Sequence, residues 1–422
     1  MALWRLGLDV LGPDPVRGSD AIKSLLPIAA AAVGLPLIIW RLAILNRQTA
    51  TAEAKTQIDR ETHYTSIFSR GVDQLGQTRD QKDIVETEQG KTSVTRTAPN
   101  IEVRLGGIHS LTRLAEESQR DAIKIERMLI SYIRENSWTD RNGQAIKWPE
   151  TIAFDVDWRR NFRGKGPFEE ARTIYDRWQA RVESAAIEVG KWRSSTPDAR
   201  VDTSEALEAI EYIIGNATTP RGTTFSETLF ANRRLSADIL RDAQFNRCVF
   251  VGSSLNFSDS SSTIFTECRF ISCHLDMNGA KASFEFGQIL TTTIYGVDSE
   301  LHVSYSHIFE LDIHHSEGLL INLRRSTWHN GAGFVSDTFA LKAIGSNFSG
   351  IDFTGIRFPG GTSFNACVLV DVDFQISDLS AVEIIGTSLE HVVADESTLH
   401  PGSIKRPSSW PEYHANANTD EP

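Results

Sequence analysis

Histidines and cysteines are the residues in this 422-residue chain whose types could do chemistry. Neutral imidazole is a common ligand for zinc and other transition metals, so clustered histidines could bind a metal ion if the fold brought their rings to one face. The spacing here is irregular and no HExxH pair is present, so we predict no metal site. Five of the eleven histidines fall in one stretch: His302, His307, His314, His315 and His329.

The four cysteines are arranged more regularly. Cys248 and Cys268 are twenty residues apart, and Cys273 follows five residues later. No Cys-x-x-Cys pair supports a zinc site. Because cysteine behaves as a small hydrophobe, we expect buried free thiols, which suit a reducing compartment.

Motifs for catalysis or cofactor binding are missing from the sequence. There is no nucleophile elbow and no dinucleotide fingerprint, and Gly164-Lys165-Gly166 lacks the other residues of a phosphate-binding loop. The basic and aromatic cluster at residues 158–165 could touch nucleic acid or anionic lipid headgroups. Four nearby acidic residues favour a solvated loop instead, so nucleic acid is not an expected partner. We predict no catalytic, cofactor-binding or metal residues, and no enzyme.

A five-residue repeat runs from Phe225 to Leu399, and any binding surface in this part of the chain would be built on it. From Phe225 to Ala280, ten of the twelve residues at every fifth position are Phe or Leu, and the residue two places earlier is mostly small. Helices repeat every 3.6 residues and strands every 2, so neither explains a period of five. The pattern predicts a chain that turns a corner every five residues, with four sides closing a coil of twenty and the coils stacking into a solenoid.

The repeat slips and restarts in its later part, as it would if single residues were inserted at corners. Clear runs cover residues 348–358 and 364–399. An ordinary β-sandwich with chance spacing is the alternative, and ten matches in one frame argue against it. A weaker run passes through Ile308, Ile313, Gly318, Leu323 and Trp328.

This pattern resembles the pentapeptide-repeat family, whose consensus is a small residue, then Asp or Asn, then Leu or Phe, then two variable residues. Pairs such as Asn347-Phe348 and Asp373-Phe374 carry the resemblance, which covers somewhat under half the chain. It implies a mainly β fold, with a right-handed quadrilateral pentapeptide-repeat β-helix over residues 223–400. The residues that we predict to be buried in its first coils are Phe245, Phe250, Leu255, Phe265, Phe270 and Leu275.

The repeat also carries nearly all of the chain's excess negative charge. The whole chain has a formal net charge of −12, and residues 223–400 contain 21 Asp and Glu against 10 Lys and Arg. Between Asn330 and His400 there are 9 acidic residues and 2 basic ones. The predicted solenoid is therefore acidic, most of all in its last third.

Leu25 to Trp40 is a run of sixteen residues without a charge. Sixteen helical residues span about 24 Å, slightly less than a ~30 Å hydrocarbon core, and the apolar residues after Arg41 extend that length. We predict an N-terminal flank at residues 1–23 and a transmembrane helix at 24–45. A cleaved signal peptide and a buried core helix are the alternatives.

The charges that flank this segment predict its orientation. Arg41 and Arg47 follow it before any acidic residue, whereas the N-terminal flank is balanced. By the positive-inside rule the chain would be a single-pass protein of the inner (cytoplasmic) membrane, with its C-terminal bulk in the cytoplasm.

Two helical regions are predicted between this segment and the repeat. Residues 46–136 would form a helical linker module, with a loop at Thr78–Pro99 and a glycine pair, Gly106-Gly107, where another backbone packs close. The phrase VRLGGI at residues 103–108 is similar to one in membrane-anchored bacterial pentapeptide-repeat proteins, and no enzymatic role attaches to it. Residues 137–222 would form a Trp-rich helical elaboration, capped at its last helix by Asp202 or Thr203, and residues 401–422 a flexible tail.

These observations favour a binding protein over an enzyme. The leading hypothesis is a membrane-tethered protein–protein interaction scaffold that presents an acidic β-helix to an unknown protein partner. The alternative, implied by cytoplasmic members of the family, is a DNA mimic that binds a type II topoisomerase (DNA gyrase). A membrane effector that assembles through its N-terminal helix is a third reading. The open end of the solenoid predicts either a lid formed by Trp410 or a homodimer.

Overall fold

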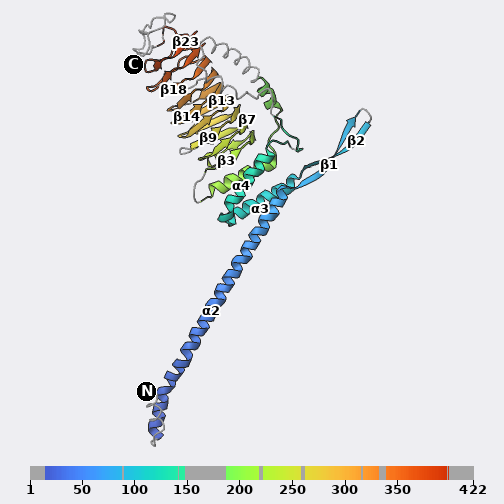
Figure 1. Ribbon diagram of the computed structural model, residues 1–422, viewed down its shortest axis with the longest axis vertical. Helices are drawn as coiled ribbons and strands as arrows, with labels where there is room; N and C mark the ends of the chain where they lie inside the picture. Colours follow the sequence, from blue (N-terminus) through green and yellow to red (C-terminus); the bar gives the residue numbers. More distant parts are fainter. Residues whose placement is uncertain are drawn as a thin grey trace, which may run out of the picture. The chain divides into compact units, whose positions relative to one another are not determined.

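The computed structural model of the chain describes residues 15–87, 90–140, 142–147, 187–217, 222–257, 262–314, 317–331, 339–396 and 398 (Figure 1). The chain divides into two compact units, Met1–Ser69 and Arg70–Pro422, which we describe separately. The predicted tail at 401–422, with Trp410, lies outside the described residues.

The first unit consists of most of one long helix, α2 (Pro15–Leu75), which contains Pro27 and Pro36. Among the described residues, no helix is both long enough and apolar enough to cross a membrane. The structure therefore does not support the transmembrane helix predicted at 24–45. The apolar run is short, is interrupted by Arg41, and continues without a break into a polar helix.

The second unit begins with the end of α2 and an antiparallel hairpin. Strands β1 (Thr78–Thr87) and β2 (Gly90–Pro99) pair along their whole length, from Thr78 opposite Pro99 to Thr87 opposite Gly90. The loop predicted for this segment is therefore wrong. Threonine, valine and isoleucine favour extended backbone, and they outweigh the charged residues on which the loop prediction rested.

Three helices follow and pack against one another: α3 (Ile101–Glu117), α4 (Gln119–Asn136) and α7 (Val201–Gly215). Residues 187–195 are also helical. A Cβ atom at Gly107 would stand 2.9 Å from the Gly71 carbonyl oxygen, so close backbone packing is confirmed at Gly107. The prediction of close backbone packing is wrong at Gly106, where a Cβ atom would meet nothing within 4 Å.

The rest of the second unit is a four-sided β-solenoid of stacked coils, coloured green to red in Figure 1. One side, which we call the Phe225 sheet, has nine parallel strands, each hydrogen-bonded to the same side of the next coil. Its strands are β3 (Thr224–Ser226), β6 (Gln244–Asn246), β9 (Ser262–Thr266), β12 (Lys281–Glu285), β14 (Glu300–Ser304), β16 (Leu320–Arg324), β18 (Ala340–Ile344), β20 (Ser363–Asn365) and β22 (Glu383–Ile385).

The adjacent side, the Phe230 sheet, stacks in the same way. Its strands are β4 (Leu229–Ala231), β7 (Val249–Val251), β10 (Arg269–Ile271), β13 (Gln288–Val297), β15 (His307–His314), β17 (Thr327–Gly331), β19 (Asn347–Ile351), β21 (Val368–Val370) and β23 (Ser388–Glu390). The third side holds β5 (Arg234–Leu235), β8 (Ser254–Phe257) and β11 (His274–Asn278), which join the Phe230 sheet through β13. A short helix, α8 (Ala237–Leu240), lies on the fourth side of the first coil.

The strand register explains the slips in the repeat. Most coils are twenty residues long, as between Phe225 and Phe245. Two consecutive coils, Phe265 to Phe284 and Phe284 to Val303, are nineteen residues long, and a later one is twenty-one. The slips therefore arise from deletions as well as from an insertion.

The predicted period-five solenoid is confirmed, and the β-sandwich alternative is wrong, because each strand pairs in parallel with the next coil. In the weaker run Gly318 is not a core residue: it turns a corner with φ +72, and Leu319 is buried in its place. All six residues predicted to be buried have no exposed surface: Phe245, Phe250, Leu255, Phe265, Phe270 and Leu275.

Aromatic rings stack along the axis of the core. Phe230, Phe250 and Phe270 lie face to face, with centroids 4.9 and 4.6 Å apart. Rings on adjacent sides meet edge to face, as in Phe265 and Phe270 at 5.0 Å. Both arrangements are favourable for aromatic pairs.

The small residues of the repeat bind the backbone inside the coil. The Ser253 hydroxyl donates to the Phe230 carbonyl oxygen at 2.9 Å and accepts from the Arg233 N–H at 3.1 Å. Cys268 takes a similar position, with its thiol 3.2 Å from the Phe245 carbonyl oxygen. All four cysteines are free and buried, which confirms that prediction. Burial raises the pKa of Cys273 to about 12.

Truncating Phe270 should destabilise the solenoid. We expect Phe270→Ala to lower the free energy of unfolding by about 3–5 kcal/mol, since it leaves a cavity between the Phe250 ring and Ile289 of the next coil. The control is Ile385→Ala, at an outward position that is 53% exposed, which should cost less than about 0.5 kcal/mol. Urea denaturation followed by circular dichroism measures both, and equal effects would contradict the burial described here.

Candidate interaction surfaces

The clustered histidines do not converge on one site. Among the described residues, no three His, Cys, Asp or Glu side chains are grouped so that they could hold a metal ion. His302 Nε2 lies 2.9 Å from a Glu300 oxygen, and His314 stacks on Tyr295 at 5.4 Å. His307 and His329 lie on the outer side of the Phe230 sheet, and His315 is outside the described residues.

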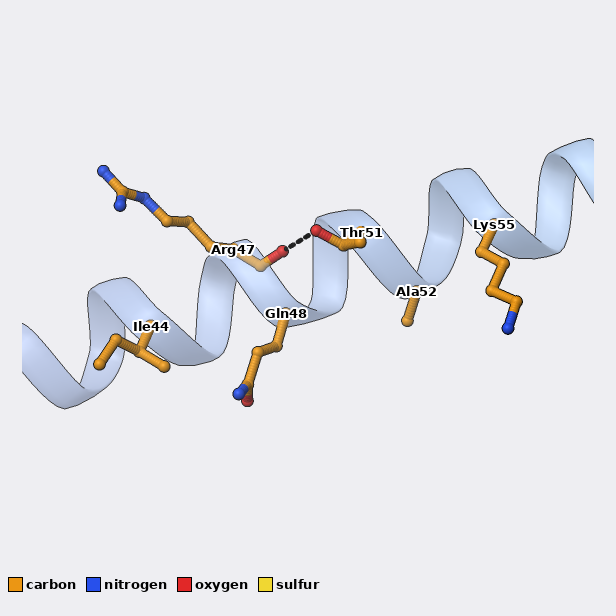
Figure 2. Close-up of a pocket in the computed structure, with 6 residues that line it drawn as sticks. All are labelled: Ile44, Arg47, Gln48, Thr51, Ala52 and Lys55. Atoms are coloured by element: carbon orange, nitrogen blue, oxygen red, sulfur yellow. Dashed lines mark hydrogen bonds between the residues drawn. The ribbon is translucent and has the colours of Figure 1, made fainter.

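A shallow hollow runs along α2 in the first unit (Figure 2). Its lining includes Arg47 and Lys55, and the Thr51 hydroxyl donates to the Arg47 carbonyl oxygen at 2.8 Å. Every lining residue comes from this one helix, so the hollow does not enclose a small molecule.

A buried polar network joins the helices that precede the solenoid. The Arg104 guanidinium, in the VRLGGI phrase, donates to the Gln77 carbonyl oxygen at 2.9 Å and to Asn136 Oδ1 at 3.0 Å. The Asp202 carboxylate is fully buried and accepts from Tyr132 and Arg200. These donors bind α3, α4 and α7 together.

The electrostatics of this network point to a structural role. Burial would raise the pKa of Asp202, but hydrogen bonds from Arg200 and Tyr132 outweigh it and hold that pKa below its ordinary value. Burial and the Asp202 charge raise the pKa of Tyr132. The predicted N-cap position of Asp202 or Thr203 is wrong, since α7 begins at Val201 and its N-cap is Arg200, although Asp202 Oδ1 accepts the Thr203 backbone N–H at 3.0 Å within the first turn. A carboxylate saturated with donors is unsuited to accept a proton.

The outer face of the Phe230 sheet carries apolar residues in each of the first five coils, beside Arg269, Gln288 and His307 in the third to fifth. These apolar residues flank the core positions and would ordinarily be polar, as half-buried strands alternate. Trp138, Ile146 and Trp192 pack against this outer face. The sheet residues of this cluster are Leu229, Ala231, Val249, Val251, Ile271, Leu290 and Phe309, and Val189 joins them from the helical residues 187–195.

Hydrogen bonds fix the described parts of the Trp-rich segment on this face. The Trp138 indole N–H donates to the Glu227 carbonyl oxygen at 2.8 Å, and that of Trp192 donates to the Lys147 carbonyl oxygen at 3.0 Å. The first of these bonds joins the segment to the solenoid, and the second joins two described parts of the segment to each other. Its basic cluster at 158–165 lies outside the described residues.

Two buried histidines lie on the same face, in the fifth and sixth coils. His307 Nδ1 is 2.7 Å from Thr327 Oγ1, and His329 is one residue beyond the core Trp328. Burial lowers the pKa of His307 to about 4 and that of His329 to about 3, the nearby His307 adding to the second shift. Both rings are neutral at physiological pH.

Two aspartates lie opposite each other on the third side of the last coils, and Asp371 stands at the adjoining corner; we call Asp352, Asp371 and Asp373 the acidic ladder. Asp352 lies directly opposite Asp373 on the next coil. Each carboxylate accepts a hydrogen bond at 2.9 Å from the backbone N–H two residues later, which fixes its position. Asp371 stands at a corner with φ +52, and its Oδ1 is 3.2 Å from His391 Nδ1.

Solved structures are similar to part of the chain. Full-length QnrB1, a plasmid-mediated fluoroquinolone resistance protein, matches with 10% identity over 42% of this chain and 93% of its own, with a TM-score of 0.22. HetL, a pentapeptide repeat protein involved in heterocyst differentiation regulation in a Nostoc cyanobacterium, matches with 13% identity over 44% and 82%, with a TM-score of 0.15. No protein-family profile and no curated protein match the sequence. The fold assignment therefore rests on the strand pairing described above.

The buried histidines should make stability depend on pH. The unfolded chain binds protons near pH 6.5, whereas folded His307 binds one only near pH 4. Stability is therefore lost as the pH falls from about 6.5, by up to about 1.4 kcal/mol per pH unit for each histidine. His307→Asn should reduce the difference in unfolding free energy between pH 7 and pH 4.5, and the exposed control His274→Asn should not. An unchanged difference in the His307 variant would contradict this burial.

Proposed function

We propose that the chain is a non-catalytic scaffold whose acidic last coils bind a basic surface on a protein partner. The observation that supports the proposal is the ladder of Asp352, Asp371 and Asp373, together with the excess of acidic residues in this part of the chain.

The ladder is suited to binding because its geometry is set before a partner arrives. Backbone hydrogen bonds hold Asp352 and Asp373, so little conformational freedom is lost on association. Like charges directly opposite on adjacent strands are destabilising. A cationic partner would offset this repulsion, so the free protein carries a cost that binding relieves.

Tethering at an inner membrane is a separate part of the proposal. The apolar run from Leu25 to Trp40 and the arginines that follow it motivate the tether, with the C-terminal bulk in the cytoplasm. It would keep the acidic coils and their partner near the membrane surface.

A DNA mimic that binds DNA gyrase is the second candidate, and the stacked acidic coils favour it. Nine coils at about 4.8 Å each form a rod of roughly 42 Å. B-DNA of that length carries roughly 25 charges, one per about 1.7 Å. The repeat carries 21 acidic and 10 basic residues, so its net charge density is less than half that of DNA. This comparison favours the more general basic partner.

Charge reversal in the ladder should abolish partner binding. We expect a protein with a basic surface to be captured by the full chain and lost by the triple variant Asp352→Lys, Asp371→Lys, Asp373→Lys. A control with the same charge change, Glu267→Lys, Asp276→Lys, Glu285→Lys, should still bind it. Quantitative mass spectrometry of affinity captures at two salt concentrations measures this, with binding weaker at high salt.

Two outcomes would count against the scaffold. Capture that is equal in both triple variants would remove the ladder from the interaction. Inhibition of gyrase supercoiling by the full chain, relieved in the ladder variant, would establish the DNA-mimic reading in its place.

Deleting residues 24–45 tests the tether. We expect the full chain to sediment with membranes and the deletion variant to remain in the soluble fraction with the same β-sheet circular dichroism. A reporter fused to the C-terminus should give a cytoplasmic signal. A full chain that remains soluble, or a periplasmic signal, would overturn this part of the proposal.

A further inference from the structure

The corner between the Phe225 and Phe230 sheets has the same backbone conformation in every coil. Each residue of this first corner has φ between +48 and +56. This left-handed region suits glycine and is unfavourable for bulky side chains. The residues at the first corner are Glu227, Arg247, Glu267, Phe286, Tyr305, Arg325, Gly345, Ala366 and Gly386.

Two aromatic residues occupy this corner in the middle coils. Phe286 has φ +56 and Tyr305 has φ +51, whereas later coils place Gly345 or Ala366 there. The left-handed backbone does not favour an aromatic side chain, so it does not explain why Phe286 and Tyr305 occupy this corner.

The side chains of three consecutive coils form a stack on the outside of the solenoid. The rings of Phe286 and Tyr305 lie 5.1 Å apart and are nearly parallel. The Arg325 guanidinium lies 5.8 Å from the Tyr305 ring centroid, and its Nη1 is 3.4 Å from the Tyr305 hydroxyl. Both rings are half-buried and Arg325 is exposed, so the stack presents its edges and its cationic end to solvent.

The coil beyond the cationic end of the stack has a glycine, Gly345, at the first corner. We call the change in surface height from Arg325 to Gly345 the step. A Cβ atom at Gly345, the next residue of the corner, would lie 3.6 Å from Arg325 Cγ, so the corner residue of the next coil contributes no side chain over the arginine. Beside it, Arg324 is exposed and Ile344 is 53% exposed. Arg324 and Arg325 are the only Lys or Arg residues between positions 282 and 341. The site is thus a cationic and apolar spot on an acidic solenoid.

We propose that Phe286, Tyr305 and Arg325, with Arg324 and Ile344 beside them, bind a protein segment in which an aromatic side chain neighbours carboxylates. The aromatic group would rest on Ile344 in the step at Gly345, and the carboxylates would pair with the two arginines. Tyrosine and arginine are the residue types that most often dominate binding energy at interfaces. This surface is distinct from the acidic ladder and does not depend on it.

The corner itself supplies a matched pair of variants. Arg325 and Arg247 are both arginines at the first corner, with φ +48 and +54, and Ala366 shows that the corner accepts alanine. Arg247 pairs instead with Glu227 at 2.7 Å, away from the aromatic stack. Tyr305→Gly adds a second test that should preserve the fold, because glycine suits this backbone.

A library of displayed 12-residue peptides, selected on the full chain, is the probe. We expect enriched peptides that combine an aromatic residue with Asp or Glu. Their affinity should fall at least tenfold for Arg325→Ala and Tyr305→Gly and stay within twofold for Arg247→Ala, with circular dichroism unchanged. Their binding should not change in the ladder triple variant.

The opposing outcomes are distinct from a failure of the proposed scaffold function. Enrichment of basic peptides alone, lost in the ladder variant but not in Arg325→Ala, would support the acidic ladder and overturn this inference. Enriched peptides that are insensitive to both stack variants, or no enrichment at all, would overturn it as well.

Discussion

The parallel pairing of each coil with the next is the constraint on which the other features depend. Coils can stack in register only if every corner uses nearly the same backbone conformation, and the first corner keeps φ near +50 from Glu227 to Gly386. Once register is fixed, equivalent side chains must lie directly above one another. Core phenylalanines then stack, buried hydroxyls bind the same carbonyl groups, and the cysteines fall where a small residue is needed.

The same constraint governs the surface. Any residue type repeated at one position becomes a line of identical groups along the axis, whether favourable or not. Valine and isoleucine beside the core positions of the Phe230 sheet give an apolar face, which Trp138 and Trp192 pack against. Aspartates at equivalent positions become a ladder of like charges. An exposed line of apolar groups lowers solubility, and an exposed line of like charges lowers stability. Each such line therefore predicts a segment or a partner that covers it.

The sequence predicted those features that depend on period alone. The buried phenylalanines, the small inward residues and the free cysteines all followed from spacing, because the core repeats with the coil. The hairpin at β1 and β2 did not, since its charged residues masked the strand-forming Thr and Val. The Asp202 network was also missed, because an aspartate in the first turn of a helix usually caps it, and only tertiary packing turns this one inward.

The aromatic stack was hidden by the two short coils. Phe286 and Tyr305 are nineteen residues apart, so a strict period of twenty places them at different positions, and only the strand register shows that they share a corner. The register also places the two proposed partner-binding surfaces on different sides of the solenoid. The Arg325 corner lies between the first and second sides, whereas Asp352 and Asp373 lie on the third side of later coils. The Phe230 sheet separates them, so a single short peptide cannot bind both, and each surface must recognise its own segment.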